Sequence, residues 1–202
     1  LETLEPRYLL SADIMPFAVD MVGDGGADYS LRYDNLIQTV QVYDNRSSLL
    51  VAQRNAAEID YIRVTGTAAN DTLTIDFGTD FLQALDIDFQ GGDGDDKLSL
   101  TGGLFDLVEF AADGAKSGVF TAVDGQISHR IGIGGVSAVT DATTAQERIF
   151  ADVTGEGQTL RLSDAGTPGD GFSTLDTING GALVSYTFAS PNLKLTIDTG
   201  AG

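Results

Sequence analysis

The chain has 202 residues, and its 30 acidic and 11 basic residues give a formal net charge of −19. Nucleic acid and anionic lipid both require clustered Lys and Arg, so this charge argues against either as a partner. The sequence has no cysteine, which excludes disulfides and thiol catalysis, and it has no apolar run of about 18 residues that would insert into a membrane.

The N-terminal stretch LEPRYLLSAD, Leu4–Asp13, predicts a short helix or an extended cap, with Pro6 near the first turn and a polar stop at its end. Its apolar side chains would cover the first coil of a repetitive fold, because an uncovered end invites edge pairing. Since the chain begins with Leu1 rather than Met, we expect a fragment or a processed product.

The same stretch resembles the LEPR-XLL signature found near the N-terminus of very large bacterial proteins. The matching positions are Leu4, Glu5, Pro6, Arg7, Leu9 and Leu10. The resemblance implies an exported or surface-exposed protein with long repetitive regions downstream, and it implies no activity. We therefore expect an N-terminal cap over residues 1–28 and a β-helical repeat domain over residues 29–202 that is truncated within a repeat.

Short runs with apolar residues at every second position indicate β-strands along the rest of the chain. The first strands are expected within Tyr29–Leu50, and the alternating runs that follow are Tyr61–Gly66, Asp71–Phe77, Leu85–Phe89, Lys97–Gly102, Gly118–Val123, Thr159–Asp164, Leu183–Phe188 and Leu193–Asp198. Clusters of Gly, Asn and Asp separate these runs and are typical of turns. Beyond the N-terminal cap, one or two turns of helix are predicted within Ala145–Val153.

Two of the predicted strands repeat each other, because NDTLTI (Asn70–Ile75) and DDKLSL (Asp95–Leu100) match at an offset of 25 residues. A weaker echo joins Ile87–Gly94 to Leu195–Gly202. The offset is close to one coil of a parallel β-helix, in which each coil buries its inward side chains against the next. The predicted fold is mostly β, a right-handed parallel β-helix (solenoid) with a short N-terminal cap. A β-sandwich is the alternative, because several turns are short enough to close hairpins.

The turn GGDGDDKLSL, Gly91–Leu100, raises the question of a bound metal ion. Calcium takes roughly six to eight oxygen ligands at flexible angles. Glycines let backbone carbonyls face the ion, and an aspartate adds an anionic oxygen. The segment resembles the calcium-binding nonapeptide GGxGxDxUx of the RTX proteins. The matching positions are Gly91, Gly92, Gly94 and Asp96, with Leu98 as the large apolar residue U.

The resemblance implies a calcium ion between two stacked turns. Its ligands would be Asp96 and the carbonyls of Gly92 and Gly94, with a further oxygen from Asp93 and a partner turn at Asn70 and Asp71, one coil earlier. That partner turn, GTAANDTLT, has alanine where the pattern requires glycine. The alternative is a corner without an ion, in which the aspartates accept hydrogen bonds from backbone N–H groups.

Catalytic signatures are weak, and we expect no enzyme. The only histidine is His129, and the sequence has no G-x-S-x-G nucleophile elbow. Asp86 and Asp88 share one face of a predicted strand, and Asp76 on the coil before would share it if the offset is not strict. Glycoside hydrolysis requires such a carboxylate pair. Ligand clefts are usually lined with aromatic residues, however, and the sequence has no tryptophan.

These patterns predict a non-catalytic, structural or adhesive β-solenoid domain at the N-terminal end of a large exported bacterial surface protein, with calcium possible as a stiffening ion. The expected location is secreted or at the cell surface. Expected partners are further repeats or copies that stack on the solenoid ends, and a surface or glycan ligand. The alternatives are a subunit of an extracellular filament or surface layer that assembles end to end, and a carbohydrate-active β-helix enzyme.

Overall fold

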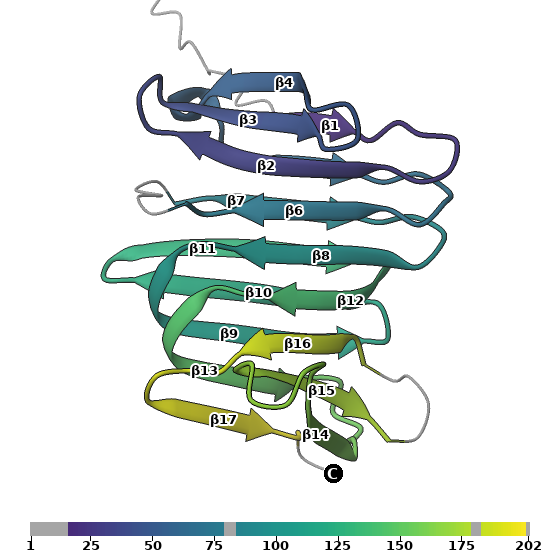
Figure 1. The fold of residues 1–202 in the computed structure, drawn as a ribbon, viewed down its shortest axis with the longest axis vertical. Coiled ribbons are helices and arrows are strands. Elements are labelled where there is room, and N and C mark those ends of the chain that lie inside the picture. Colours follow the sequence, from purple (N-terminus) through teal and green to yellow (C-terminus); the bar gives the residue numbers. More distant parts are fainter. Residues whose placement is uncertain (1–15, 79–83, 179–182, 201–202) are drawn as a thin grey trace, which may run out of the picture.

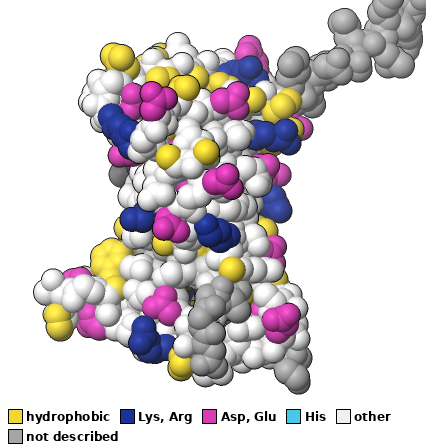
Figure 2. All heavy atoms as spheres, turned by 90° about the vertical axis from the view of Figure 1, so that its right-hand side faces the viewer, with side chains coloured by type: hydrophobic (Ala, Val, Ile, Leu, Met, Phe, Trp, Pro, Cys, Tyr) yellow, Lys and Arg dark blue, Asp and Glu magenta, His cyan; other side chains and the backbone are white. Residues whose placement is uncertain are grey.

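The computed structural model describes residues 16–78, 84–178 and 183–200, and almost all of its regular structure is β (Figure 1). Seventeen strands in this part of the chain form two large mixed sheets. One short 3-10 turn, η1 (Ala56–Glu58), follows β4. The mostly β prediction is therefore confirmed. Acidic, basic and uncharged side chains are interspersed over the face shown in Figure 2.

The strands are divided between an eight-stranded and a nine-stranded sheet. In spatial order, the eight-stranded sheet contains β1 (Phe17–Asp20), β5 (Ile62–Thr65), β7 (Asp86–Gln90), β11 (Ile127–Gly134), β10 (Ser117–Asp124), β9 (Leu104–Gly114), β13 (Thr144–Asp152) and β17 (Lys194–Asp198). The nine-stranded sheet contains β14 (Leu160–Asp164), β15 (Phe172–Thr177), β16 (Ser185–Ala189), β12 (Val136–Asp141), β8 (Asp96–Thr101), β6 (Thr72–Asp76), β2 (Asp28–Asp34), β3 (Thr39–Asp44) and β4 (Leu49–Asn55).

From β5 to β8 the chain alternates between the two sheets and pairs parallel to itself. Strand β5 pairs with β7 so that Ile62 lies opposite Ile87, and β6 pairs with β8 so that Leu73 lies opposite Leu98. Both registers correspond to an offset of 25 residues. The repeat seen in the sequence is therefore a physical register between neighbouring strands.

Antiparallel hairpins interrupt this pattern in three places. Strands β9, β10 and β11 form a meander inside the eight-stranded sheet, between β7 and β13. The nine-stranded sheet ends in β2–β3–β4 on one side and in β16–β15–β14 on the other. The molecule thus combines the parallel ladder and the hairpins that the sequence offered as alternatives.

Apolar side chains at alternate positions of both sheets meet in one core. Ile62 and Ile87 come from the eight-stranded sheet, and Leu31, Ile75 and Leu100 come from the nine-stranded sheet, all without solvent exposure. Period-two strands with one face inward produce this pattern directly. The core runs between the sheets along the length of the molecule, and it positions the corners where the chain passes from one sheet to the other.

The predicted helix within residues 145–153 is wrong, because all of these residues but the last belong to β13. Its inward positions include the polar Arg148 and Asp152, which are buried. These two buried polar residues interrupt the alternation of apolar side chains, so the sequence pattern does not predict a strand here.

The N-terminal stretch Leu4–Asp13 lies outside the described residues. Strand β1, which falls within the expected N-terminal segment 1–28, pairs in parallel with β5. Among the described residues, no helix is both long and apolar enough to cross a membrane.

Candidate functional site

The glycine–aspartate turn connects β7 to β8 and stacks on the turn that connects β5 to β6. The Asp95 N–H donates to Asn70 Oδ1 at 3.0 Å, and the Asp71 N–H donates to Asp96 Oδ1 at 2.8 Å. The turn at Asn70 and Asp71, expected as the partner turn of a calcium site, is thus a neighbour of the glycine–aspartate turn. These two bonds tie one corner of the parallel ladder to the next.

Asp71 is a buried carboxylate whose two oxygens both accept hydrogen bonds. Oδ1 accepts from the Ala27 N–H at 2.5 Å and from Thr67 Oγ1 at 3.0 Å, and Oδ2 accepts from the Thr67 N–H at 2.5 Å. The side chain is only 1% exposed. Buried carboxylates are stable when N–H and O–H donors replace water. Asp71 thus joins three successive turns of the chain, from Ala27 through its own turn to Asp96.

Asp96 occupies the equivalent place 25 residues later, with fewer donors. Its Oδ1 accepts from the Asp71 N–H, and its Oδ2 has no hydrogen-bond partner among the residues that the structure describes. Thr67 is matched here by Gly92, which has no hydroxyl group to offer. Burial therefore raises the pKa of Asp96 above its ordinary value, and the neighbouring charge of Asp71 adds to the effect.

Gly91 explains why this corner requires glycine. A Cβ atom at this position would lie 2.5 Å from Asp96 Oδ2, which is closer than side-chain carbons approach an oxygen. The same holds at Gly66, one coil earlier, where a Cβ atom would lie 2.0 Å from the Gly91 carbonyl oxygen. The glycines of the turn therefore allow close stacking of one coil on another as well as tight turning.

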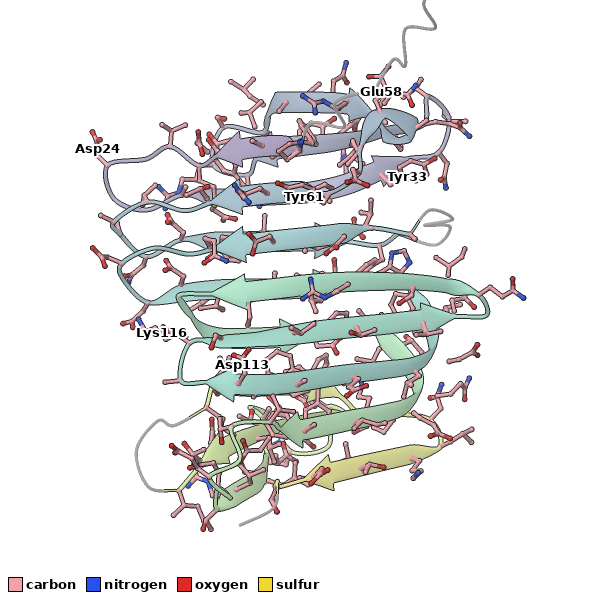
Figure 3. The ribbon with its side chains drawn as sticks, turned by 180° about the vertical axis from the view of Figure 1, so that it is seen from behind. Asp24, Tyr33, Glu58, Tyr61, Asp113 and Lys116 are labelled. Carbon is pink, nitrogen blue, oxygen red and sulfur yellow. The ribbon has the colours of Figure 1, made fainter. Side chains whose placement is uncertain are left out.

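The remaining predicted calcium ligands lie on the outer side of the turn. Asp93 is exposed, Gly92 has a φ of +97°, and the Gly94 carbonyl accepts a hydrogen bond from Lys116 Nζ at 2.5 Å. Figure 3 shows Lys116 at the tip between β9 and β10. Its ammonium group supplies a positive charge beside the aspartates. No local pattern in the sequence pointed to Lys116, because it reaches this turn from a hairpin 22 residues away.

Across the described part of the chain, no three His, Asp or Glu side chains gather in a group that could hold a metal ion. The carboxylates of Asp71 and Asp96 face backbone N–H groups of the stacked corners. Asp96 Oδ2 is the one oxygen of this pair without a hydrogen-bond partner in the described residues.

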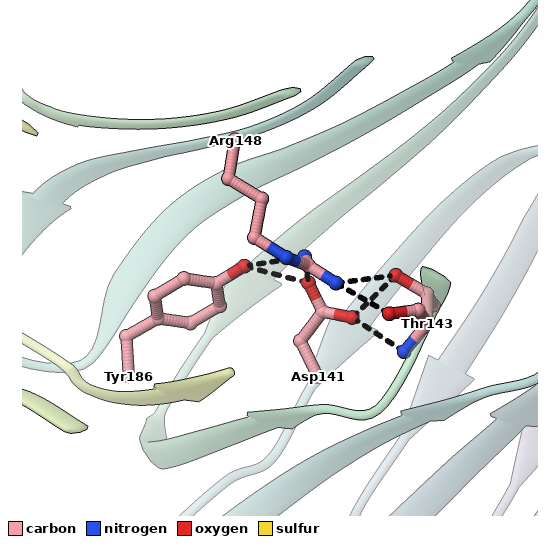
Figure 4. A network of polar contacts seen from close by, with 4 residues as sticks. All are labelled: Asp141, Thr143, Arg148 and Tyr186. Carbon is pink, nitrogen blue, oxygen red and sulfur yellow. Dashed lines mark hydrogen bonds and ion pairs between the residues drawn. The ribbon is translucent and has the colours of Figure 1, made fainter. Parts of the chain in front are cut away.

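A second buried polar cluster lies between β12, β13 and β16, and sequence reasoning missed it (Figure 4). Arg148 forms an ion pair with Asp141 Oδ2 and donates to the Thr143 carbonyl oxygen at 2.5 Å. Tyr186 donates its hydroxyl proton to Asp141 Oδ2 at 2.6 Å. Asp141 Oδ1 accepts from the N–H and the hydroxyl of Thr143 at 2.9 and 2.6 Å.

This cluster is closed to solvent. The Arg148 and Asp141 side chains are 1% and 0% exposed. Burial raises the pKa of Tyr186 well above its ordinary value, and the charge of Asp141 raises it further, so the phenol keeps its proton. A substrate has no access to these groups, and their arrangement holds the corner between β12 and β13 against β16. The only signal in the sequence was the polar Arg148 in QERIF, at an inward strand position.

Aspartates that end strands cap three further corners. Asp76, Asp152 and Asp198 each accept a hydrogen bond from the N–H two residues later, at Gly78, Thr154 and Gly200. Burial alone would raise the pKa of Asp152, but hydrogen bonds from Thr154 and Gln158 together lower it. An aspartate in this position mimics a backbone turn and satisfies an N–H group that leaves the strand.

Of the three carboxylates considered for a hydrolase, two share one face of β7 and the third lies in the other sheet. Asp86 and Asp88 lie on the outer face of the eight-stranded sheet, where they pair with Arg130 at 3.2 Å and with Arg63 at 3.7 Å. Asp76 belongs to β6 in the other sheet, so its expected place on the same face as Asp86 and Asp88 is wrong.

The only histidine, His129, is a core residue in the eight-stranded sheet. It is 1% exposed, and its ring lies against Phe77 and Phe105 with centroid separations of 5.3 and 5.9 Å. Burial lowers the pKa of His129 to about 4, so the imidazole is neutral at physiological pH. Its neutral state and its aromatic surroundings are those of a packing residue.

Comparison of the chain with protein-family models, with curated proteins and with solved structures found no match. Function is therefore inferred from the chain's own residues and their arrangement.

Proposed function

We propose that this chain is a non-catalytic structural module, a parallel β-solenoid domain near the N-terminal end of a large exported bacterial surface protein. The observation that carries the proposal is the stacked pair of corners at Asp71 and Asp96. Each corner carboxylate accepts a hydrogen bond from an N–H group of a neighbouring coil, Asp71 from Ala27 and Asp96 from Asp71. The second of these bonds has the same 25-residue offset that relates β6 to β8. Hydrogen bonds between successive coils stabilise the stacking of coils along one axis, which is what a structural module requires.

The distribution of acidic groups supports a structural role. Asp71, Asp76, Asp141, Asp152 and Asp198 all accept hydrogen bonds from backbone N–H groups at corners. A catalytic carboxylate pair needs two accessible groups at a fixed separation across a cleft. The corner aspartates instead replace water for N–H groups where the chain leaves one sheet for the other.

Deletion of one coil tests the solenoid assignment. Removing residues 66–90 joins Thr65 to Gly91, which reproduces the Gln90–Gly91 junction because Thr65 lies opposite Gln90. In a solenoid, β5 then takes the place of β7 beside β11, and we expect a β-rich circular dichroism spectrum and cooperative unfolding. The matched control removes residues 66–89, which shifts every following side chain to the wrong face. If both deletions leave the chain unfolded, the solenoid assignment is overturned.

Calcium bound at the glycine–aspartate turn is a second proposal, supported by the buried Oδ2 of Asp96, which no described residue contacts through a hydrogen bond. The oxygen atoms at this turn match only part of a calcium coordination shell. Asp96 and the carbonyls of the glycine turn supply oxygens, whereas both oxygens of Asp71 already accept hydrogen bonds and Lys116 competes for the Gly94 carbonyl. A bound ion would stiffen the stacked corners outside the cell, where calcium is plentiful.

Thermal unfolding with calcium and with chelator tests this second proposal. A ligand that binds only the folded state at a hundred times its dissociation constant adds about 2.7 kcal/mol. We expect the melting temperature to rise with calcium in the wild type and not in Asp96→Ala. Asp88→Ala, which removes an exposed carboxylate elsewhere, is the control and should keep the response. A wild type without any shift would leave the turn as a corner held by hydrogen bonds alone.

An adhesive role for the same module is supported by an open cleft of about 500 Å³ beside Lys116, with both polar and apolar lining. Its walls carry charged and hydroxyl side chains from the nine-stranded sheet and the β9–β10 tip. They include Asp95, Lys116, Ser137, Arg161, Asp176 and Ser185. Hydroxyl-rich ligands such as glycans bind through donors and acceptors of this kind. Nuclear magnetic resonance titration with neutral oligosaccharides, against Asp176→Asn as control, would detect binding in the millimolar range.

A further inference from the structure

A row of hydroxyl groups crosses the outer face of the nine-stranded sheet. Neighbouring members of the row are direct partners in the register of the sheet. In spatial order the row contains Ser30 of β2, Thr74 of β6, Ser99 of β8, Thr140 of β12, Thr187 of β16, Thr174 of β15 and Ser163 of β14. These residues are called the hydroxyl row. Figure 1 shows β2, β6, β8, β12 and β16 one below another, so the row follows the long axis of the molecule.

The hydroxyl row faces away from the core. On β6, Thr74 lies between Leu73 and Ile75, which are both 0% exposed, and successive side chains of a strand point to opposite faces. Every member of the row is half-buried or exposed. Thr174 and Thr187 share a hydrogen bond of 2.9 Å, whereas the other hydroxyls of the row form none with a side chain of the described chain. These groups are therefore available to a ligand.

The row has the spacing of the sheet itself. Neighbouring strands lie about 4.8 Å apart, so hydroxyl groups recur at that interval over about 19 Å from β2 to β16. One ring of an extended polysaccharide covers a similar length, and each ring carries hydroxyl groups of its own. A sugar chain that lies across the strands therefore brings one unit to each strand.

The charge of the chain restricts the ligand. The hydroxyl row is uncharged, whereas the whole chain has a net charge of −19. An anionic polymer would be repelled by this excess of negative charge. A neutral polymer instead meets donors and acceptors without repulsion, so the row favours a neutral polysaccharide over an acidic one.

The row is continuous with the open cleft already described. Ser185 and Asp176 line that cleft and lie two positions along their strands from Thr187 and Thr174. The Ser185 hydroxyl donates to Asp176 Oδ1 at 2.6 Å, and the Arg161 guanidinium lies 3.7 Å from Asp176 Oδ2. Charged groups form stronger hydrogen bonds than neutral ones, so the cleft is the stronger end of the combined surface.

We propose that the cleft and the hydroxyl row form one binding face for a neutral, extended polysaccharide, which lies across the strands from the cleft towards β2. The inference rests on the adhesive role proposed above and names the class of its ligand. Thr and Ser also suit exposed strand positions through conformational preference alone. That explanation predicts no contribution of the row to binding.

Isothermal titration calorimetry with the disaccharides and hexasaccharides of cellulose, xylan and mannan tests the proposal. At least one hexasaccharide should bind about tenfold more tightly than its disaccharide, because its further units reach further hydroxyl groups. Thr74→Val with Thr140→Val removes two hydroxyls of the row and keeps the β-branched shape. This variant should lose about tenfold in hexasaccharide affinity and nothing in disaccharide affinity.

The matched control carries Thr72→Val and Thr101→Val, on the same face of β6 and β8 but outside the row. It should bind both saccharides as the wild type does. An equal loss in the two double variants would overturn the proposal, because the row would then be no different from the rest of the face. Disaccharide binding without a gain for the hexasaccharide would also overturn it and leave the cleft as the adhesive site. Absence of binding by every saccharide would contradict the adhesive role and this inference together.

Discussion

Two corners of this molecule bury a carboxylate in different ways. At the corner before β6, Asp71 accepts hydrogen bonds from two backbone N–H groups and one hydroxyl, and it forms no ion pair with a described residue. At the corner after β12, Asp141 is paired with the buried guanidinium of Arg148 and the hydroxyl of Tyr186. Both carboxylates are almost without solvent exposure.

The two corners differ in the residues that they require elsewhere in the chain. The Asp71 corner relies mainly on backbone N–H groups, which every coil contains, and it recurs in part at Asp96, 25 residues later, where Gly92 replaces Thr67. The Asp141 cluster needs an arginine and a tyrosine at single places on β13 and β16, and it stands alone among the described corners. Backbone donors suit a repeating structure, whereas a buried ion pair fixes one place in it.

The largest expected effect comes from breaking the ion pair. Arg148→Met removes the counter-ion and leaves Asp141 charged and buried, which should cost about 3–5 kcal/mol of unfolding free energy in urea. Adding Asp141→Asn keeps an oxygen for the Thr143 N–H and removes the charge, so the double variant should regain most of the loss. A single variant within 1 kcal/mol of wild type would show that the cluster does not hold this corner.

The second largest effect is expected at His129, a polar group that is buried in its neutral form. The pKa of His129 is about 4 in the folded protein and about 6.5 when unfolded, so folding favours the neutral ring. Its contribution is complete above pH 6.5 and is lost as the pH falls towards 4, to a total of about 3 kcal/mol. Urea midpoints across this range should fall less steeply in His129→Phe than in wild type, and equal slopes would contradict the expectation.

The third effect tests the donors around Asp71. Asp71→Asn keeps the shape but turns an NH2 group towards a backbone N–H, leaving a buried donor without an acceptor. We expect a loss of about 1–3 kcal/mol at pH 7 by urea denaturation. Asp106→Asn, an exposed change of the same kind, provides the baseline. A loss no larger than this baseline would mean that the corner tolerates rearrangement.

The smallest effect on the free energy of unfolding is expected at Asp96, where the substitution should not destabilise the protein. Because burial raises the pKa of this carboxyl, its charged form destabilises the folded state, and stability falls as the pH rises from 3.8 through the folded pKa. Asp96→Asn should therefore be neutral or slightly stabilising at pH 7 in the absence of calcium. A loss as large as that of Asp71→Asn would show that the two corners bury their carboxylates in the same way.

The strands with clean alternation and the 25-residue offset were predictable from the sequence. Runs such as DTLTIDF and KLSLTG have one apolar face, and Gly-Asp turns mark their ends. The neighbouring turn at Asn70 and Asp71 was predictable for the same reason. Strands β1, β9, β11, β12, β13 and β15 were not among the predicted strands. In β13, polar residues at inward positions disturb the period of two.

The partners of the corner groups were not predictable. Lys116 reaches Gly94 from a hairpin tip, and Tyr186 reaches Asp141 from 45 residues away. Neither distance is a multiple of the repeat. A single sequence reveals contacts between repeated segments, because the two segments have the same residue pattern. It gives no signal for contacts between segments whose residue patterns differ. The ion pair of Arg148 belongs to this second kind.

The β9–β10–β11 meander has a consequence for the order in which the chain folds. Its strands pair through short turns, so their contacts close small loops, whereas each parallel pair must close a loop of 25 residues or more. Small loops cost less conformational entropy and form earlier. The meander lies in the middle of the eight-stranded sheet, with β7 on one side and β13 on the other. We expect it to nucleate folding, with the parallel strands then adding outward in both directions.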